Sequence, residues 1–196
     1  MQFKLLPDKY FIAWLALLSL SFFLSSNGVY AQFIDSTAPP PKPLGSVLRT
    51  VREIDMTNDT IPEIMQIETT KAKRLRDIKV RFAIYSSEKK LLYSHNWKAN
   101  DFFDPKDHLP DTIKWFRLQR LLRTFFSNQN FSVCDSDCYS SLFSRVRAAD
   151  IKLGTLEEQE FVAAPHKVFS VYAGRDDLYG ITWLDSKKKF VTLWHN

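Results

Sequence analysis

The sequence predicts a single α+β domain in which an antiparallel sheet of about five strands has helices packed on one face. Three observations support this prediction. Residues 78–85 alternate apolar and polar side chains, as a half-buried strand does. Residues 112–126 place most of their apolar side chains along one side of a helix. Three short strand-like runs, at 167–173, 178–184 and 189–194, end the chain and are separated by turn-forming residues.

The first 31 residues have the three-part pattern of a cleavable secretory signal. Lys4 and Lys9 give a basic start, and residues 11–24 form an uncharged apolar run. This run is shorter than the roughly 20 residues that a helix needs to span a bilayer. Small residues precede the expected cleavage site after Ala31. We therefore expect a chain that is exported, to the periplasm or outside the cell, and that keeps no transmembrane helix.

Residues 32–45 form a proline-rich segment that we expect to be a linker. Proline fixes the backbone in an extended form and donates no backbone hydrogen bond, which favours a tether over a packed element. A Pro-x-x-Pro ligand for an aromatic groove is the alternative. The globular domain then covers residues 46–196. Cleavage after Ala31 removes two lysines and one aspartate, so the net charge falls from +5 to +4.

The first two elements of the domain are expected to be helices. Residues 46–54 place apolar side chains at helical spacing, and Ser46 is available as the N-cap. Residues 60–76 begin with Thr60 and Glu63 at the spacing of a capping box, in which each side chain bonds the other residue's backbone N–H.

Residues 78–85 and 91–97 are expected to form a hairpin around the polar turn at 86–90. This hairpin and the three C-terminal strands make up the predicted sheet. A loop at 101–110 leads to the helix at 112–126, whose arginines lie opposite its apolar side. Another helix is expected from residue 138 to about residue 149.

Cys134 and Cys138 are the only cysteines, and export to an oxidising compartment favours a disulfide between them. Half of a zinc site completed by His108 or His166 is the alternative. Zinc signatures normally contain a second ligand pair at defined spacing, and this sequence has none. We expect no metal and no cofactor.

The weak candidates for catalysis are His166, Asp176 and Asp177. His166 follows a proline at the start of a predicted strand, where it could face a cleft. Adjacent residues on a strand point to opposite faces, so the two aspartates are poorly placed to share a site. Adjacent acidic residues of this kind more commonly lie in a solvated turn. The sequence also contains no nucleophile elbow.

Basic residues gather in two places, at 71–81 and on the polar side of the helix at 112–126. Arg117, Arg120 and Arg123 are the candidates for binding a partner or an anion. Such charges are attracted to lipid headgroups, acidic polysaccharide or nucleic acid, although a merely solvated surface is common. No specific nucleic-acid-binding signature is present. We would sooner expect an anionic envelope surface or an acidic partner.

Two functions are compatible with this pattern. The first is an exported non-catalytic domain that binds an envelope or extracellular component. The alternative is a small secreted hydrolase with a site near His166, Asp176 and Asp177. Asn58 and Asn130 also match the acceptor pattern for N-glycosylation, which matters only in a host that glycosylates.

Overall fold

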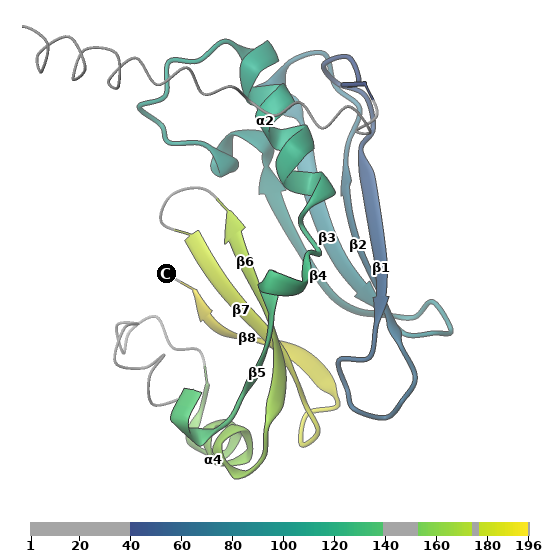
Figure 1. Cartoon of the computed structure of the whole chain (residues 1–196), viewed down its shortest axis with the longest axis vertical. Helices are drawn as coiled ribbons and strands as arrows, with labels where there is room; N and C mark the ends of the chain where they lie inside the picture. Colours follow the sequence, from purple (N-terminus) through teal and green to yellow (C-terminus); the bar gives the residue numbers. More distant parts are fainter. Residues whose placement is uncertain (1–39, 139–152, 174–176, 196) are drawn as a thin grey trace, which may run out of the picture. The chain divides into compact units, whose positions relative to one another are not determined.

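The computed structural model describes residues 40–138, 153–173 and 177–195 (Figure 1). The predicted signal, most of the proline-rich segment and the helix expected from residue 138 to about 149 lie outside these ranges. The folded unit begins at Pro41. It therefore includes the last residues of the segment that composition suggests is a linker.

The strands form two antiparallel sheets of four strands each, and each sheet follows chain order. The first sheet contains β1 (Arg49–Ile54), β2 (Glu63–Thr69), β3 (Lys79–Tyr85) and β4 (Leu91–Lys98). The second contains β5 (Phe131–Cys134), β6 (His166–Ala173), β7 (Asp177–Leu184) and β8 (Lys189–His195). The mixed α and β character is confirmed, whereas the single sheet of about five strands is wrong. The hairpin and the C-terminal meander belong to different sheets. The hairpin's sheet also contains β1 and β2, and the meander's sheet also contains β5.

The described helices are short and connect or cover the sheets (Figure 1). The α-helices are α2 (Asp111–Arg123) and α4 (Thr155–Ala163), and the 3₁₀ turns are η1 (Leu75–Asp77), η2 (Ala99–Phe102) and η3 (Asn128–Asn130). The hairpin, the helix at 112–126 and the three C-terminal strands are confirmed, as β3–β4, α2 and β6–β8, except that α2 ends at Arg123, before Phe125 and Phe126. They are the segments whose periodicity is clearest in the sequence.

The helices expected at 46–54 and 60–76 are wrong, because these segments contain β1 and β2. In β2 the buried face contains Glu63, Met65, Ile67 and Thr69, of which two are polar, while Ile64 lies on the other face, so the sequence does not show the apolar alternation that marks a half-buried strand. Glu63 does not form the expected capping box with Thr60. Its carboxylate instead accepts hydrogen bonds from the backbone N–H of Met56 (2.7 Å) and the hydroxyl of Thr57 (3.0 Å).

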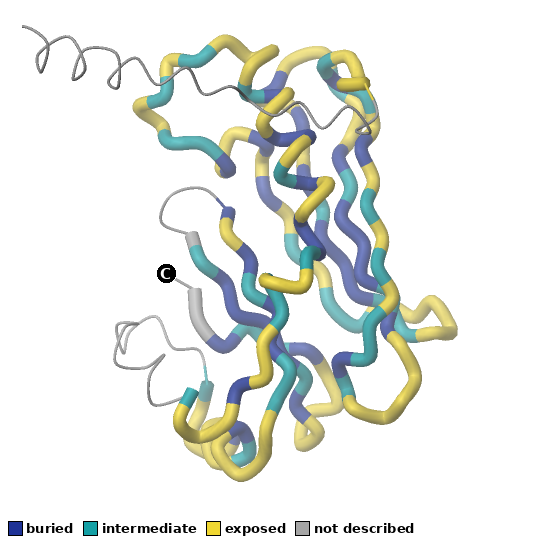
Figure 2. The backbone as a smooth tube through the Cα atoms, in the orientation of Figure 1, coloured by how far each residue is buried: buried dark blue, intermediate teal, exposed yellow. Residues whose placement is uncertain are grey.

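An aromatic cluster joins the two sheets at the centre of the main core. Phe82 on β3 is fully buried. Its ring contacts Phe125 and Phe126, which follow α2, and Phe169 on β6, with ring centroids 6.0, 6.1 and 5.5 Å away. Tyr93 on β4 also touches Phe82, and its hydroxyl lies 3.0 Å from Thr192 Oγ1 on β8. The buried segments of both sheets meet along this zone (Figure 2).

A smaller core lies on the other face of the second sheet, under α4. Cys134 and Phe161 are buried there with Val168, Leu184 and Leu193. Cys134 is bonded to Cys138, which is the disulfide that the sequence predicts. The bridge fixes the end of β5 beside this core.

Reduction of the disulfide is expected to lower the free energy of unfolding by about 2 kcal/mol, because a loop this short restricts the unfolded chain only slightly. The measurement is urea unfolding of the wild-type protein with and without reductant. A Cys134→Ala/Cys138→Ala variant should show no further dependence on reductant. Equal stability of the oxidised and reduced wild-type proteins would contradict the prediction.

Candidate functional site

The exposed face of α2 is the first part of the candidate site. Trp115, Leu118 and Leu122 are buried against the body of the protein, so the opposite side of the helix faces solvent. Arg117, Arg120 and Arg123 are all exposed on it. The sequence-based placement of these arginines is therefore confirmed.

The start of the folded unit holds α2 in place. The backbone N–H of Lys42 donates to Gln119 Oε1 (2.8 Å). The Lys42 carbonyl accepts hydrogen bonds from Trp115 Nε1 (3.0 Å) and Gln119 Nε2 (2.9 Å). Gln119 is only 3% exposed, so these bonds satisfy polar groups that burial would otherwise penalise. They fix the rotation of the helix and thereby the direction of its arginines.

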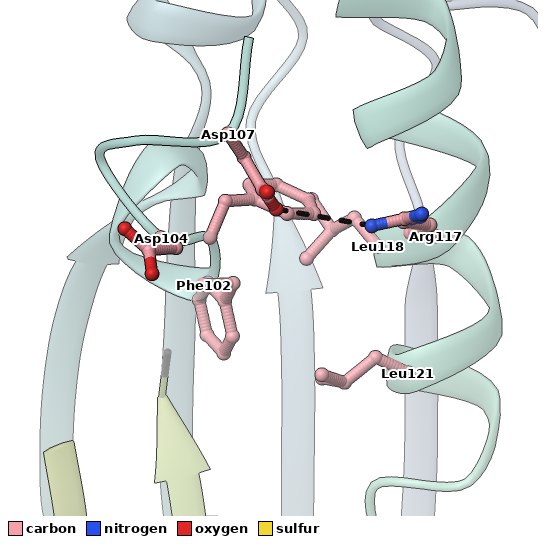
Figure 3. Close-up of a pocket in the computed structure, with 7 residues that line it drawn as sticks. Phe102, Asp104, Asp107, Arg117, Leu118 and Leu121 are labelled. Atoms are coloured by element: carbon pink, nitrogen blue, oxygen red, sulfur yellow. Dashed lines mark ion pairs between the residues drawn. The ribbon is translucent and has the colours of Figure 1, made fainter. Parts of the chain in front are cut away.

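A pocket of about 310 Å³ lies between α2 and the loop after η2. Its apolar wall and floor come from Phe102, Phe103, Leu118 and Leu121, and its charged groups come from Asp104, Asp107 and Arg117 (Figure 3). Arg117 Nη1 lies 3.8 Å from Asp107 Oδ2, so an ion pair spans the pocket between helix and loop. The two side chains are 56% and 42% exposed, and such pairs contribute little to stability.

The loop at 103–110 has its own internal bonds, which set the position of Asp107. The backbone N–H of Asp107 donates to the Asp104 carbonyl (2.9 Å), and Asp104 Oδ1 accepts from the backbone N–H of Lys106 (2.8 Å). The ammonium of Lys114 lies 5.8 Å from the centre of the Phe103 ring, a cation–π distance. These contacts hold the loop side of the pocket in place against α2.

The sequence indicates Arg117 but not the rest of this pocket. Phe102, Phe103 and Asp107 belong to a 3₁₀ turn and an irregular loop, where periodicity gives no information about which side chains face inward. The only local signals are the prolines and aspartates of 101–110, and these mark a turn rather than a site.

The candidate catalytic residues are not gathered in the described part of the chain. His166 begins β6 and Asp177 begins β7. β6 and β7 are antiparallel, with Ala173 opposite Asp177, so His166 and Asp177 start at opposite ends of the sheet. At about 3.3 Å per residue, the strand between them spans more than 20 Å. Asp176 lies outside the described residues.

His166 lies against α4. Its ring stacks on Phe161 at a centroid distance of 4.9 Å, and its Nε2 lies 3.3 Å from the carbonyl oxygen of Glu160. The Glu160 carboxylate accepts backbone N–H bonds from Asp185 (2.6 Å) and Ser186 (3.2 Å). Burial raises the pKa of Glu160, but these bonds and the nearby His166 outweigh it and leave the pKa below its usual value. The arrangement ties α4 to the β7–β8 turn.

The remaining candidates are placed as follows. Within the described ranges, no group of three or more His, Cys, Asp or Glu side chains could hold a metal ion. His108 is exposed in the loop before α2. Asn58 is exposed in the β1–β2 loop, whereas the side-chain amide of Asn130 donates to the Phe125 carbonyl (2.8 Å).

Comparison with known proteins found no match to this chain among family models, curated proteins or solved structures. Among the helices that the structure describes, none is long and apolar enough to cross a membrane.

Proposed function

We propose that this chain is an exported, non-catalytic domain that binds another envelope or extracellular component through the exposed face of α2. The observation that carries the proposal is the position of Arg117, which combines an exposed guanidinium with an adjoining apolar pocket. Export rests on the predicted signal at 1–31, and the Cys134–Cys138 disulfide is compatible with it.

The chemistry of the pocket favours a partner with an acidic group next to an apolar side chain. Phe102, Leu118 and Leu121 offer an apolar surface, and a buried apolar group is the usual anchor of an interface. The ion pair between Arg117 and Asp107 is long and solvated, so a carboxylate of the partner can replace Asp107 at little cost. Arginine suits this exchange because its planar guanidinium binds carboxylates in a bidentate manner.

The lining of the pocket supports binding rather than catalysis. Its titratable groups are two aspartates and an arginine, and its other side chains are apolar. Asp107 is paired with Arg117, and Asp104 Oδ1 accepts the backbone N–H of Lys106, so each carboxylate already has a structural partner. The lining also includes no serine, cysteine, threonine or histidine. The hydrolase alternative draws no support from the separation of His166 and Asp177.

Charge reversal at Arg117, Arg120 and Arg123 is expected to weaken capture of the partner at least tenfold without unfolding the protein, since all three side chains are exposed. The measurement has two steps. The wild-type protein is first crosslinked to components of its own envelope or extracellular fraction, and the captured component is identified and purified. Its affinity for the wild-type and Arg117→Glu/Arg120→Glu/Arg123→Glu proteins is then compared at low salt.

The matched control is Lys89→Glu/Lys90→Glu/Lys189→Glu, which changes the net charge equally at exposed positions away from α2. Its affinity for the purified partner should stay close to that of the wild type. Unchanged affinity of the arginine variant would mean that the face of α2 is merely solvated. Equal loss in both variants would indicate attraction by net charge alone, and either result would contradict the proposal.

A further inference from the structure

A second basic surface lies at one end of the first sheet, away from the pocket. β2 ends, β3 begins and β4 ends at this edge, and Lys79 is paired in register with Lys98. The loop from β2 to β3 lies at the top of Figure 1, where the tube of Figure 2 is mostly exposed. We call this surface the basic end; its exposed members are Lys71, Lys73, Arg76, Lys79 and Lys98.

The acidic residues of this region are already engaged by other groups. Asp77 pairs with Arg74 at 2.7 Å, and Asp101 accepts the backbone N–H of Lys98 at 2.8 Å. Asp111, at the start of α2, accepts the backbone N–H of Leu75 at 3.4 Å. These three carboxylates hold turns and helix ends in place and offset three of the six cations at residues 71–79 and 98, which leaves an excess of three positive charges.

Most of the cations of the basic end have no partner of their own. Within the described residues, no hydrogen bond or ion pair engages the side chains of Lys71, Lys73, Arg76 or Lys79. Four positive charges without a bonded partner therefore occur within nine consecutive residues, on a loop and strand start that are exposed to solvent. Fixed charges of one sign at one end of a domain create a field that attracts an extended anionic surface.

The composition of this surface favours a lipid bilayer over a nucleic acid. A site for single-stranded nucleic acid interleaves aromatic rings with its cations, and residues 70–79 contain no aromatic residue. Anionic headgroups require only a cluster of lysines and arginines close to the bilayer surface. α2 starts at the same end of the sheet, and Ile113 in its first turn is 45% exposed, so an apolar side chain is also available there.

We propose that the basic end docks this protein on the surface of bilayers that contain anionic phospholipid. The contact uses lysines outside the pocket of α2, so it is independent of the function proposed above. Each lysine near the bilayer contributes roughly a fivefold gain in partitioning, and salt weakens the attraction because it screens exposed charges.

The test is cosedimentation of the purified chain, without its predicted signal, with vesicles of phosphatidylcholine and phosphatidylglycerol. The wild-type protein should bind these vesicles at low salt, should be released at high salt, and should not bind vesicles of phosphatidylcholine alone. Lys71→Glu/Lys73→Glu should lower the partition coefficient about twentyfold or more, because two favourable contacts are lost. Circular dichroism confirms that the variant is folded.

The matched control is Lys89→Glu/Lys90→Glu, which carries the same charge change on the β3–β4 turn at the opposite end of the strands. Its partition coefficient should fall by no more than about threefold, the effect of net charge alone. Three results would overturn the proposal: no binding to the anionic vesicles, equal binding to both kinds of vesicle, or equal losses in the two variants.

Discussion

Replacement of Phe82 by alanine is expected to lower the free energy of unfolding by about 4 kcal/mol. Phe82 is fully buried, and its ring contacts Tyr93, Phe125, Phe126 and Phe169. These contacts come from the first sheet, the segment after α2 and the second sheet. Truncation would leave a cavity that none of these elements can fill alone. The loss of stability therefore includes the penalty for this cavity as well as the transfer free energy of the buried ring.

The measurement is urea unfolding followed by tryptophan fluorescence. The matched control is Tyr172→Ala on β6, because this aromatic side chain is 62% exposed and should change stability by less than about 0.5 kcal/mol. A loss at Phe82 as small as that of the control would mean that the two sheets do not depend on this cluster.

Gly45→Ala is expected to lower the free energy of unfolding by about 3 kcal/mol, for two reasons whose effects add. Gly45 has φ +82°, where a residue with a Cβ is disfavoured by roughly 1–2 kcal/mol. A Cβ at this position would lie 1.9 Å from the carbonyl oxygen of Ala72, so the backbone must also shift. The glycine is the third residue of a turn in which the backbone N–H of Ser46 donates to the Pro43 carbonyl at 3.1 Å.

The matched control is Gly154→Ala at the start of α4. Gly154 has a negative φ, and an added Cβ would meet only the end of the flexible Glu157 side chain at 3.4 Å. The free energy of unfolding of this variant should be less than about 1 kcal/mol below that of the wild type in the same urea titration. Equal losses of stability in the two variants would contradict the argument that a side chain at Gly45 strains the turn before β1.

The candidate site was predictable only in part. Arg117, Arg120 and Arg123 follow from helical periodicity, because an amphipathic helix that packs on a core must expose its polar side. The pocket beside Arg117 did not follow, since Phe102 and Asp107 reach it from an irregular segment. The separation of His166 from Asp177 depends on the antiparallel pairing of β6 and β7. His166 directly precedes one predicted strand and Asp177 lies in the predicted turn before the next, so the sequence locates each residue without showing how far apart the two side chains lie.

Local pattern determined β3, β4 and α2, in which apolar side chains face the core and most polar side chains do not. It also marked the C-terminal meander, whose strands are short apolar runs bounded by turn residues. The presence of only two cysteines, Cys134 and Cys138, in a chain predicted to be exported was likewise enough to predict their disulfide. Tertiary structure alone decided that 49–54 and 63–69 are strands and that the strands divide into two sheets. The physical reason is that burial and hydrophobicity do not coincide in these segments. β1 has no fully buried residue, and the buried face of β2 combines the polar Glu63 and Thr69 with Met65 and Ile67, so the alternation of burial in β2 is not an alternation of hydrophobicity. Its conformation is set by the strands on either side of it.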